Sequence, residues 1–104
     1  MIAIKDQTKF VDQIREKEVC LVEFGAEWCP PCKTLLPILD TMDKEYDGSV
    51  MFLKVDCDES PEISSQYEIM SMSTVIVFHH GEPVDKIVGL RSKSAYQAAI
   101  ARYI

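Results

Sequence analysis

The sequence predicts an α/β fold in which a mixed sheet of about five strands is covered by four helices. Apolar runs typical of buried strands alternate with segments whose apolar residues recur every three or four positions. Residues 74–89 contain two apolar stretches around Gly81, which indicates an antiparallel pair of strands. The chain has 104 residues, 47% of them hydrophobic. This size fits one hydrophobic core, so we expect a single domain over residues 1–104.

The first half of the chain predicts two strands and two helices in alternation. Residues 1–4 fit a short edge strand, and Asp6 is placed to cap the helix that follows. Residues 19–26 are almost continuously apolar, as in a strand that is buried on both faces. A long helix then begins at two prolines and ends near Asp47. The strand at 19–26 should therefore be central in the sheet.

The second half predicts three strands and two helices. Residues 50–56 form the third strand, and Ser60 and Pro61 suit the cap and first position of a short helix. The hairpin at 74–89 follows, and apolar residues at helical spacing after Ser92 predict a closing helix. Strands that alternate with helices and end in a hairpin indicate a mixed sheet with helices on both faces.

The composition excludes several classes of partner. The net charge is −6 and the pI is near 4.8, whereas nucleic-acid-binding surfaces are usually basic. No stretch approaches the ~20 apolar residues that span a bilayer, and the first ten residues lack the apolar segment of a secretory leader. We therefore expect a cytoplasmic monomer with neither nucleic acid nor membrane among its partners.

A pair of cysteines lies where the central strand meets the long helix. Cys29 and Cys32 are separated only by two prolines. The N-terminus of a helix offers unpaired N–H groups and a positive dipole end, which stabilise a thiolate. The prolines fit the first helical turn and hold the two cysteines in fixed relation, which lowers the entropic cost of closing a disulfide. Because proline has no N–H, the N–H groups of Cys32 and Lys33 remain as donors to the Cys29 sulfur.

In a reducing compartment such a pair is redox-active or metal-binding. A structural zinc site needs four ligands, and Cys20 and Cys57 do not form a second close pair. His79 and His80 lie six residues beyond Ser73, or ~20 Å along a strand at about 3.3 Å per residue, too far to reach the cysteines. We therefore expect no metal. Both further cysteines are expected to be buried, with a regulatory thiol as the alternative for Cys57.

Two other residues near the pair are informative. Glu23 lies inside the apolar strand, where desolvation would raise the pKa of its carboxyl group. The alternative is that Glu23 occupies a solvated position of the sheet. Trp28, the only tryptophan, stands at the end of the strand, which favours a place on the rim of the site over a place in the core.

The segment VEFGAEWCPPCK resembles the active-site segment of the thioredoxin family, W-C-x-P-C-K. Pro37, KVDCDESPEISSQYEI, TVIVF, HHGEPV and IVGL follow in the family's order, so the resemblance covers essentially the whole chain. It implies the thioredoxin fold and a thiol–disulfide oxidoreductase that reduces protein disulfides. Thioredoxin reductase would then return the cysteine pair to its reduced form. The resemblance also implies that Cys29 is the exposed attacking thiolate and Cys32 the shielded resolving thiol, with no cofactor beyond their disulfide.

The resemblance implies roles for the neighbouring residues as well. The family has a buried aspartate where this chain has Glu23, and a nearby lysine that matches Lys54. Glu23 is therefore the candidate general base for Cys32, with one methylene more than the family's residue. Trp28 would pack beside the disulfide. Gly25 replaces a residue that is commonly bulky, so looser packing is expected there.

The expected docking surface for substrates and reductase is an apolar rim around the disulfide. Its members are Trp28, Pro31, Met72, Ser73, Gly89 and Leu90. The family has a cis-proline where this chain has Ser73. A cis bond before a residue other than proline costs ~2.5 to 4 kcal/mol, so a trans Met72–Ser73 peptide in a rearranged loop is expected.

Ser73 leaves several alternatives open. The protein could remain a reductase with altered docking, and Ser73 could be either natural or introduced. Loss of the proline could instead leave a substrate-trapping or low-activity variant. In the third alternative, Cys29 and Cys32 bind a metal or an iron–sulfur cluster on the same scaffold.

Overall fold

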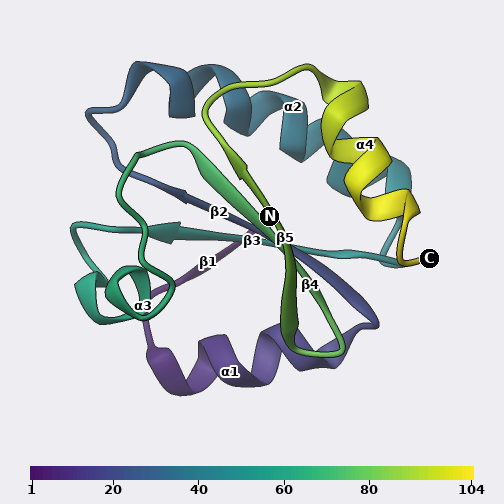
Figure 1. Ribbon diagram of the computed structural model, residues 1–104, viewed down its shortest axis with the longest axis horizontal. Coiled ribbons are helices and arrows are strands. Elements are labelled where there is room, and N and C mark those ends of the chain that lie inside the picture. Colours follow the sequence, from purple (N-terminus) through teal and green to yellow (C-terminus); the bar gives the residue numbers. More distant parts are fainter.

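The computed structural model describes residues 1–104 and contains one five-stranded sheet with four helices, as the sequence predicts (Figure 1). The elements in chain order are β1 (Ile2–Ile4), α1 (Gln7–Glu16), β2 (Val19–Gly25), α2 (Pro30–Tyr46), β3 (Met51–Asp56), α3 (Pro61–Gln66), β4 (Thr74–His79), β5 (Glu82–Val88) and α4 (Lys93–Ala101). None of the four helices combines the length and the apolar character that a membrane crossing requires.

The strand β2 lies at the centre of the sheet, whose order is β1-β3-β2-β4-β5. β1 and β2 run parallel to β3, whereas β4 runs antiparallel to both β2 and β5. All seven residues of β2 are buried, which confirms the prediction from its apolar run. The register places Glu23 between Lys54 of β3 and Val75 of β4.

Two hydrophobic cores sandwich the sheet. α2 and α4 cover one face, and α1 and α3 cover the other (Figure 1). The first core combines side chains of β2, β3 and β4 with Leu35, Leu39, Met42, Tyr96, Ala99 and Ile100 of its two helices. The second contains Phe10, Ile14 and Ile63 of the opposite helices. Burial on both faces explains why the central strands lack the polar alternation of a half-exposed sheet.

The helix ends follow local rules that the sequence predicts. Asp6 caps α1, and its carboxylate accepts hydrogen bonds from the backbone N–H groups of Thr8 and Lys9. α2 ends at Asp47, whose left-handed backbone (φ 49°) stops the helix. At its other end the capping residue of α2 is Cys29. The junction between the central strand and the long helix therefore fixes the position of this cysteine.

Candidate active site

Cys29 and Cys32 form a disulfide at the junction of β2 and α2, with their Cα atoms 5.3 Å apart. The N–H group of Cys32 donates to the Cys29 sulfur at 3.3 Å, as expected for a sulfur at the helix N-cap. Of the two candidate donors, Cys32 therefore bonds to the sulfur and Lys33 does not. The Lys33 N–H group donates instead to the Cys29 carbonyl at 3.3 Å, in an i to i−4 backbone hydrogen bond at the start of the helix.

Both cysteines are buried in this disulfide form, each with 2% of its surface exposed. They form a small apolar cluster with Ala26, against which the partly buried Met72 packs. The expectation of an exposed Cys29 is therefore wrong for the disulfide form, in which Met72, distant in sequence, packs against the cysteine cluster. Cys32 is shielded, as the resemblance implies.

Glu23 is buried with 3% of its surface exposed, so the alternative of a solvated sheet position is wrong. Burial raises the pKa of its carboxyl group to about 7; Lys54 opposes the rise and Asp56 adds to it. The Oε2 atom has no hydrogen-bond partner. Lys54 pairs with Glu23 in the register of the sheet, but its exposed ammonium group makes no ion pair with the carboxylate. The site thus holds a carboxyl group that exchanges its proton near neutral pH.

The lack of a side chain at Gly25 makes room for the Glu23 carboxyl group and the Cys32 sulfur. A Cβ atom at this position would overlap Oε2 of Glu23 and lie 2.8 Å from the Cys32 sulfur. The carboxyl group and the resolving sulfur therefore converge on the space that a side chain would fill. At Gly25 itself the longer Glu23 occupies the volume that a side chain would fill, and looser packing of Trp28 beside the disulfide stays a prediction.

A cleft of about 580 Å³ adjoins this region. Its lining includes Glu23, Gly25, Lys33, Lys54 and Asp56. The cleft gives the otherwise buried carboxyl group a path for proton exchange with solvent that does not pass the disulfide. Charged groups of both signs line it, which suits water better than an apolar ligand.

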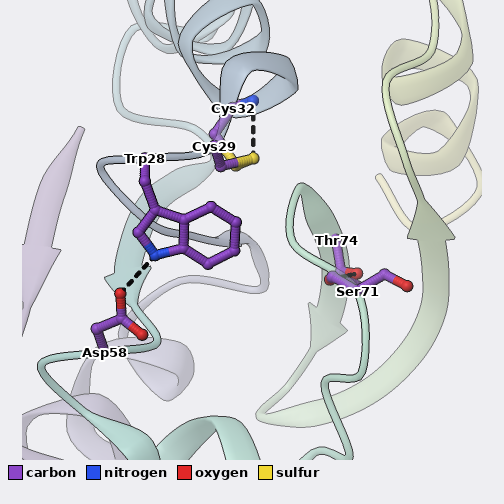
Figure 2. The surroundings of a disulfide bond; sticks show 6 residues. All are labelled: Trp28, Cys29, Cys32, Asp58, Ser71 and Thr74. Carbon is purple, nitrogen blue, oxygen red and sulfur yellow. Dashed lines mark hydrogen bonds between the residues drawn. A yellow bond between two sulfur atoms is a disulfide. The ribbon is translucent and has the colours of Figure 1, made fainter.

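Trp28 stands on the rim with 64% of its surface exposed, as its place at the end of the strand predicts. Figure 2 shows its indole beside the disulfide, with the ring nitrogen directed toward Asp58. That N–H group donates to the Asp58 carboxylate at 2.7 Å. Asp56 shapes the turn that presents Asp58, since its carboxylate accepts the N–H groups of Asp58 and Glu59. Asp58 is not among the site residues predicted from the sequence, although the aspartates after β3 carry this turn signal.

The Met72–Ser73 peptide is trans, as the sequence predicts, because the chain contains no cis peptide bond. Ser73 has a left-handed backbone (φ 65°), a conformation that costs roughly 1–2 kcal/mol for a residue with a Cβ atom. Its carbonyl accepts the N–H group of Gly89 at 3.1 Å, and nearby Thr74 donates to the Ser71 carbonyl at 2.7 Å (Figure 2). The Ser73 hydroxyl is buried without a partner. The rearranged loop is thus held by its neighbours.

The remaining rim residues lie on two short segments. Pro31 is exposed in the first turn of α2, and Leu90 is 39% exposed beside Gly89. Tyr96 of α4 anchors this second segment, because its hydroxyl donates to the Gly89 carbonyl at 3.2 Å and accepts the Arg91 N–H at 3.0 Å. The sequence pattern predicts the closing helix but not this contact of Tyr96 with the rim.

The remaining candidates are two cysteines and two histidines, of which only Cys57 lies beside this site, since its N–H group donates to the Gly25 carbonyl at 2.8 Å. Cys20 and Cys57 are both buried, as predicted, and burial raises the pKa of each thiol. β4 brings Thr74 opposite Phe24 near the disulfide, whereas His79 lies opposite Val19 at the far end of β2. The separation of the histidines from the cysteines is therefore confirmed.

Comparisons with known proteins agree with this geometry. The family model described as Thioredoxin matches residues 1–102. A thioredoxin of Staphylococcus epidermidis is 40% identical over the full length of both chains, and one of Staphylococcus saprophyticus is 42% identical over 93% of this chain and 92% of its own. The structure of Plasmodium falciparum thioredoxin superposes with a TM-score of 0.90 at 35% identity and covers both chains completely. The chain belongs to the thioredoxin family of thiol–disulfide oxidoreductases.

Proposed function

We propose that Cys29 is the attacking thiol and Cys32 the resolving thiol in the reduction of protein disulfides. The Cys29 thiolate attacks one sulfur of the target disulfide and releases the other as a thiolate. Cys32 then loses its proton and attacks the Cys29 sulfur, which forms the Cys29–Cys32 disulfide and releases the second target thiolate. The target gains two electrons, which the cysteine pair loses. The N-cap position of Cys29 and its hydrogen bond from Cys32 support this order, because both stabilise a Cys29 thiolate.

Glu23 is the general base for Cys32 in this proposal. Its pKa of about 7 is matched to proton transfer at neutral pH, where base and conjugate acid are both populated. Convergence of Oε2 and the Cys32 sulfur at Gly25 supports transfer directly or through one water molecule. Lys54 tunes the base, since its positive charge opposes the rise in the pKa of Glu23. The single observation that carries the assignment is this buried carboxyl group beside the resolving sulfur.

The rim of Trp28, Pro31, Met72, Ser73, Gly89 and Leu90 is the proposed docking surface. Protein disulfides and reductases are the general partners of the family. For this chain we place both a thioredoxin reductase and the protein substrates on the same rim, because both must reach one disulfide. Met72 packs against the cysteine cluster here, so we expect its side chain to move when a partner docks. The cytoplasmic location, the monomeric state and the absence of a further cofactor belong to the same proposal.

The first test follows the mixed disulfide in a single turnover with a protein disulfide substrate. We expect no reaction with Cys29→Ser and accumulation of the mixed disulfide with Cys32→Ser. Glu23→Gln should slow resolution about 100-fold near pH 7, the typical contribution of a general base, and abolish the rise in rate with pH. An exposed carboxylate replaced in Glu62→Gln is the matched control. Resolution by Glu23→Gln at the parent's rate from about pH 6 to 9 would remove Glu23 from the mechanism.

A second test addresses Ser73. We expect this chain and its Ser73→Pro variant both to reduce a protein disulfide with dithiothreitol as electron donor, with Cys29→Ser as the blank. The parent has the cysteine pair and Glu23 in place. The proline variant must rebuild the loop, because proline fixes φ at about −65° whereas Ser73 has φ 65°, but it returns this position to the residue usual in the family. Turnover by the proline variant alone would show that Ser73 disables the site. A visible charge-transfer band that disappears in Cys29→Ser would instead favour metal or cluster binding.

A further inference from the structure

A second cluster of reactive side chains lies at the end of the sheet opposite the disulfide. It consists of Glu18, just before β2, His79, the last residue of β4, and His80 in the turn to β5. One ligand atom from each lies within 4.8 Å of the others. Two imidazoles and one carboxylate form a ligand set that suits zinc and its neighbours among the transition metals. The proposed disulfide chemistry does not use this cluster.

The distances match a tetrahedral centre. Zinc binds histidine nitrogen at 2.0–2.1 Å and carboxylate oxygen at a similar distance, so two ligand atoms of one ion stand about 3.3 Å apart. Nε2 of His79 lies 3.3 Å from Oε1 of Glu18, and Nε2 of His80 lies 3.9 Å from the same oxygen. All three ligand atoms lie within 4.8 Å of one another, so the exposed His80 side chain has to turn toward the other two before they can share one ion.

The backbone holds the three residues together without an ion. The N–H group of His80 donates to the Glu18 carbonyl at 2.9 Å, and His79 faces Val19 in the sheet register. His80 has a left-handed backbone (φ 51°), which turns its ring to within 4.3 Å of the His79 ring. The centroid of the Tyr103 ring lies 5.3 Å from that of the His79 ring. A site whose ligands are already adjacent needs little ordering when the ion binds.

Access and charge favour a cation here. The side chains of His80 and Glu18 are 69% and 57% exposed, so water can complete the coordination of an ion that has three protein ligands. The net charge of −6 adds a general attraction for cations. Every histidine of the chain belongs to this cluster, so histidine-dependent binding reports on it alone.

We propose that Glu18, His79 and His80 form a binding site for a divalent transition-metal ion such as zinc. The ion would link the start of β2 to the end of β4 and to the β4–β5 turn. It would therefore stabilise the folded chain without taking part in disulfide exchange.

The test is a calorimetric titration of the disulfide form with zinc, because Cys29 and Cys32 cannot offer thiolates in that form. We expect saturable binding of one ion per chain. His79→Gln, His80→Gln and Glu18→Gln should each weaken binding about 10-fold or more, whereas Glu62→Gln should leave the affinity unchanged. Absence of saturable binding would overturn the proposal, as would binding that persists when both histidines are replaced.

Thermal unfolding supplies a second readout. Zinc at ~100 times its dissociation constant should raise the melting temperature of the disulfide form by on the order of 10 °C. The double variant His79→Gln/His80→Gln should keep the metal-free melting temperature, which shows that it folds, and should lose the shift. A shift of equal size in the double variant would assign the effect to the acidic surface and overturn the site. Disulfide reduction by the metal-free variants should match the parent.

Discussion

Gly25 is a small residue with a large steric consequence. Its missing side chain leaves the volume in which the Glu23 carboxyl group and the Cys32 sulfur meet. A longer acid and a smaller neighbour thus compensate each other, because a side chain at position 25 would displace one group or the other. The backbone carbonyl of Gly25 also accepts the N–H group of Cys57 at 2.8 Å, which fixes the chain at this point.

This coupling predicts a non-additive response to mutation. Gly25→Ala should lower the free energy of unfolding by about 1–3 kcal/mol, the usual effect of overpacking, and should slow resolution by Cys32. Glu23→Asp shortens the acid, so the double variant Gly25→Ala/Glu23→Asp should recover at least about 1 kcal/mol of the stability lost in Gly25→Ala. Urea unfolding of the disulfide forms gives the free energies of unfolding of the parent, of each single variant and of the double variant, which together form a double-mutant cycle. Strictly additive effects would show that the two positions do not share the space.

At the scale of elements, α4 supports the docking rim through one phenol. Tyr96 is fully buried, and its hydroxyl bridges the backbone at Gly89 and Arg91. Gly89 in turn donates to Ser73, so the helix, the segment after β5 and the loop before β4 form one connected unit. A buried hydroxyl that both donates and accepts keeps two backbone polar groups satisfied.

Tyr96→Phe should therefore lower the free energy of unfolding by about 1–3 kcal/mol, because two partly buried hydrogen bonds, to Gly89 and Arg91, are lost. Amide hydrogen exchange at Arg91 should become faster for the same reason. Tyr103→Phe is the matched control, since the half-buried Tyr103 makes only a longer bond of 3.4 Å to the Val84 carbonyl. Equal effects of the two substitutions would contradict the anchoring role of Tyr96.

At the scale of the whole molecule, Glu23 links global stability to pH. The folded state raises the pKa of this carboxyl group from its ordinary 4.5 to about 7, so folding favours the protonated form. The resulting stabilisation is fully present below about pH 4.5 and is lost as the pH rises through about 7. A shift of this size corresponds to on the order of 3 kcal/mol.

The comparison of the parent with Glu23→Gln isolates this contribution. Relative to the glutamine variant, the parent should lose on the order of 3 kcal/mol of unfolding free energy between about pH 4 and pH 9. Urea unfolding of the disulfide forms at several pH values provides the measurement. Glu62→Gln should follow the parent throughout. Parallel curves for the parent and Glu23→Gln would mean that the carboxyl group has the same pKa in the folded and unfolded chains.

The order of the elements, the central place of β2 and the position of Cys29 could all be predicted from the sequence. Each depends on neighbours in the chain: apolar periodicity marks the elements, and two prolines locate the start of α2. The burial of Glu23 also follows from its strand, because an unbroken apolar run leaves no solvated face.

Tertiary structure alone decided the contacts between segments that are distant in the chain. Trp28 and Asp58 are 30 positions apart, and Glu18 and His79 are 61 positions apart. Met72 packs against the cysteine cluster from a loop that local patterns do not place. The convergence of Glu23 and Cys32 at Gly25 likewise depends on how α2 packs on the sheet. Local propensity and periodicity constrain only residues a few positions apart, whereas strand register and helix packing determine which distant side chains meet.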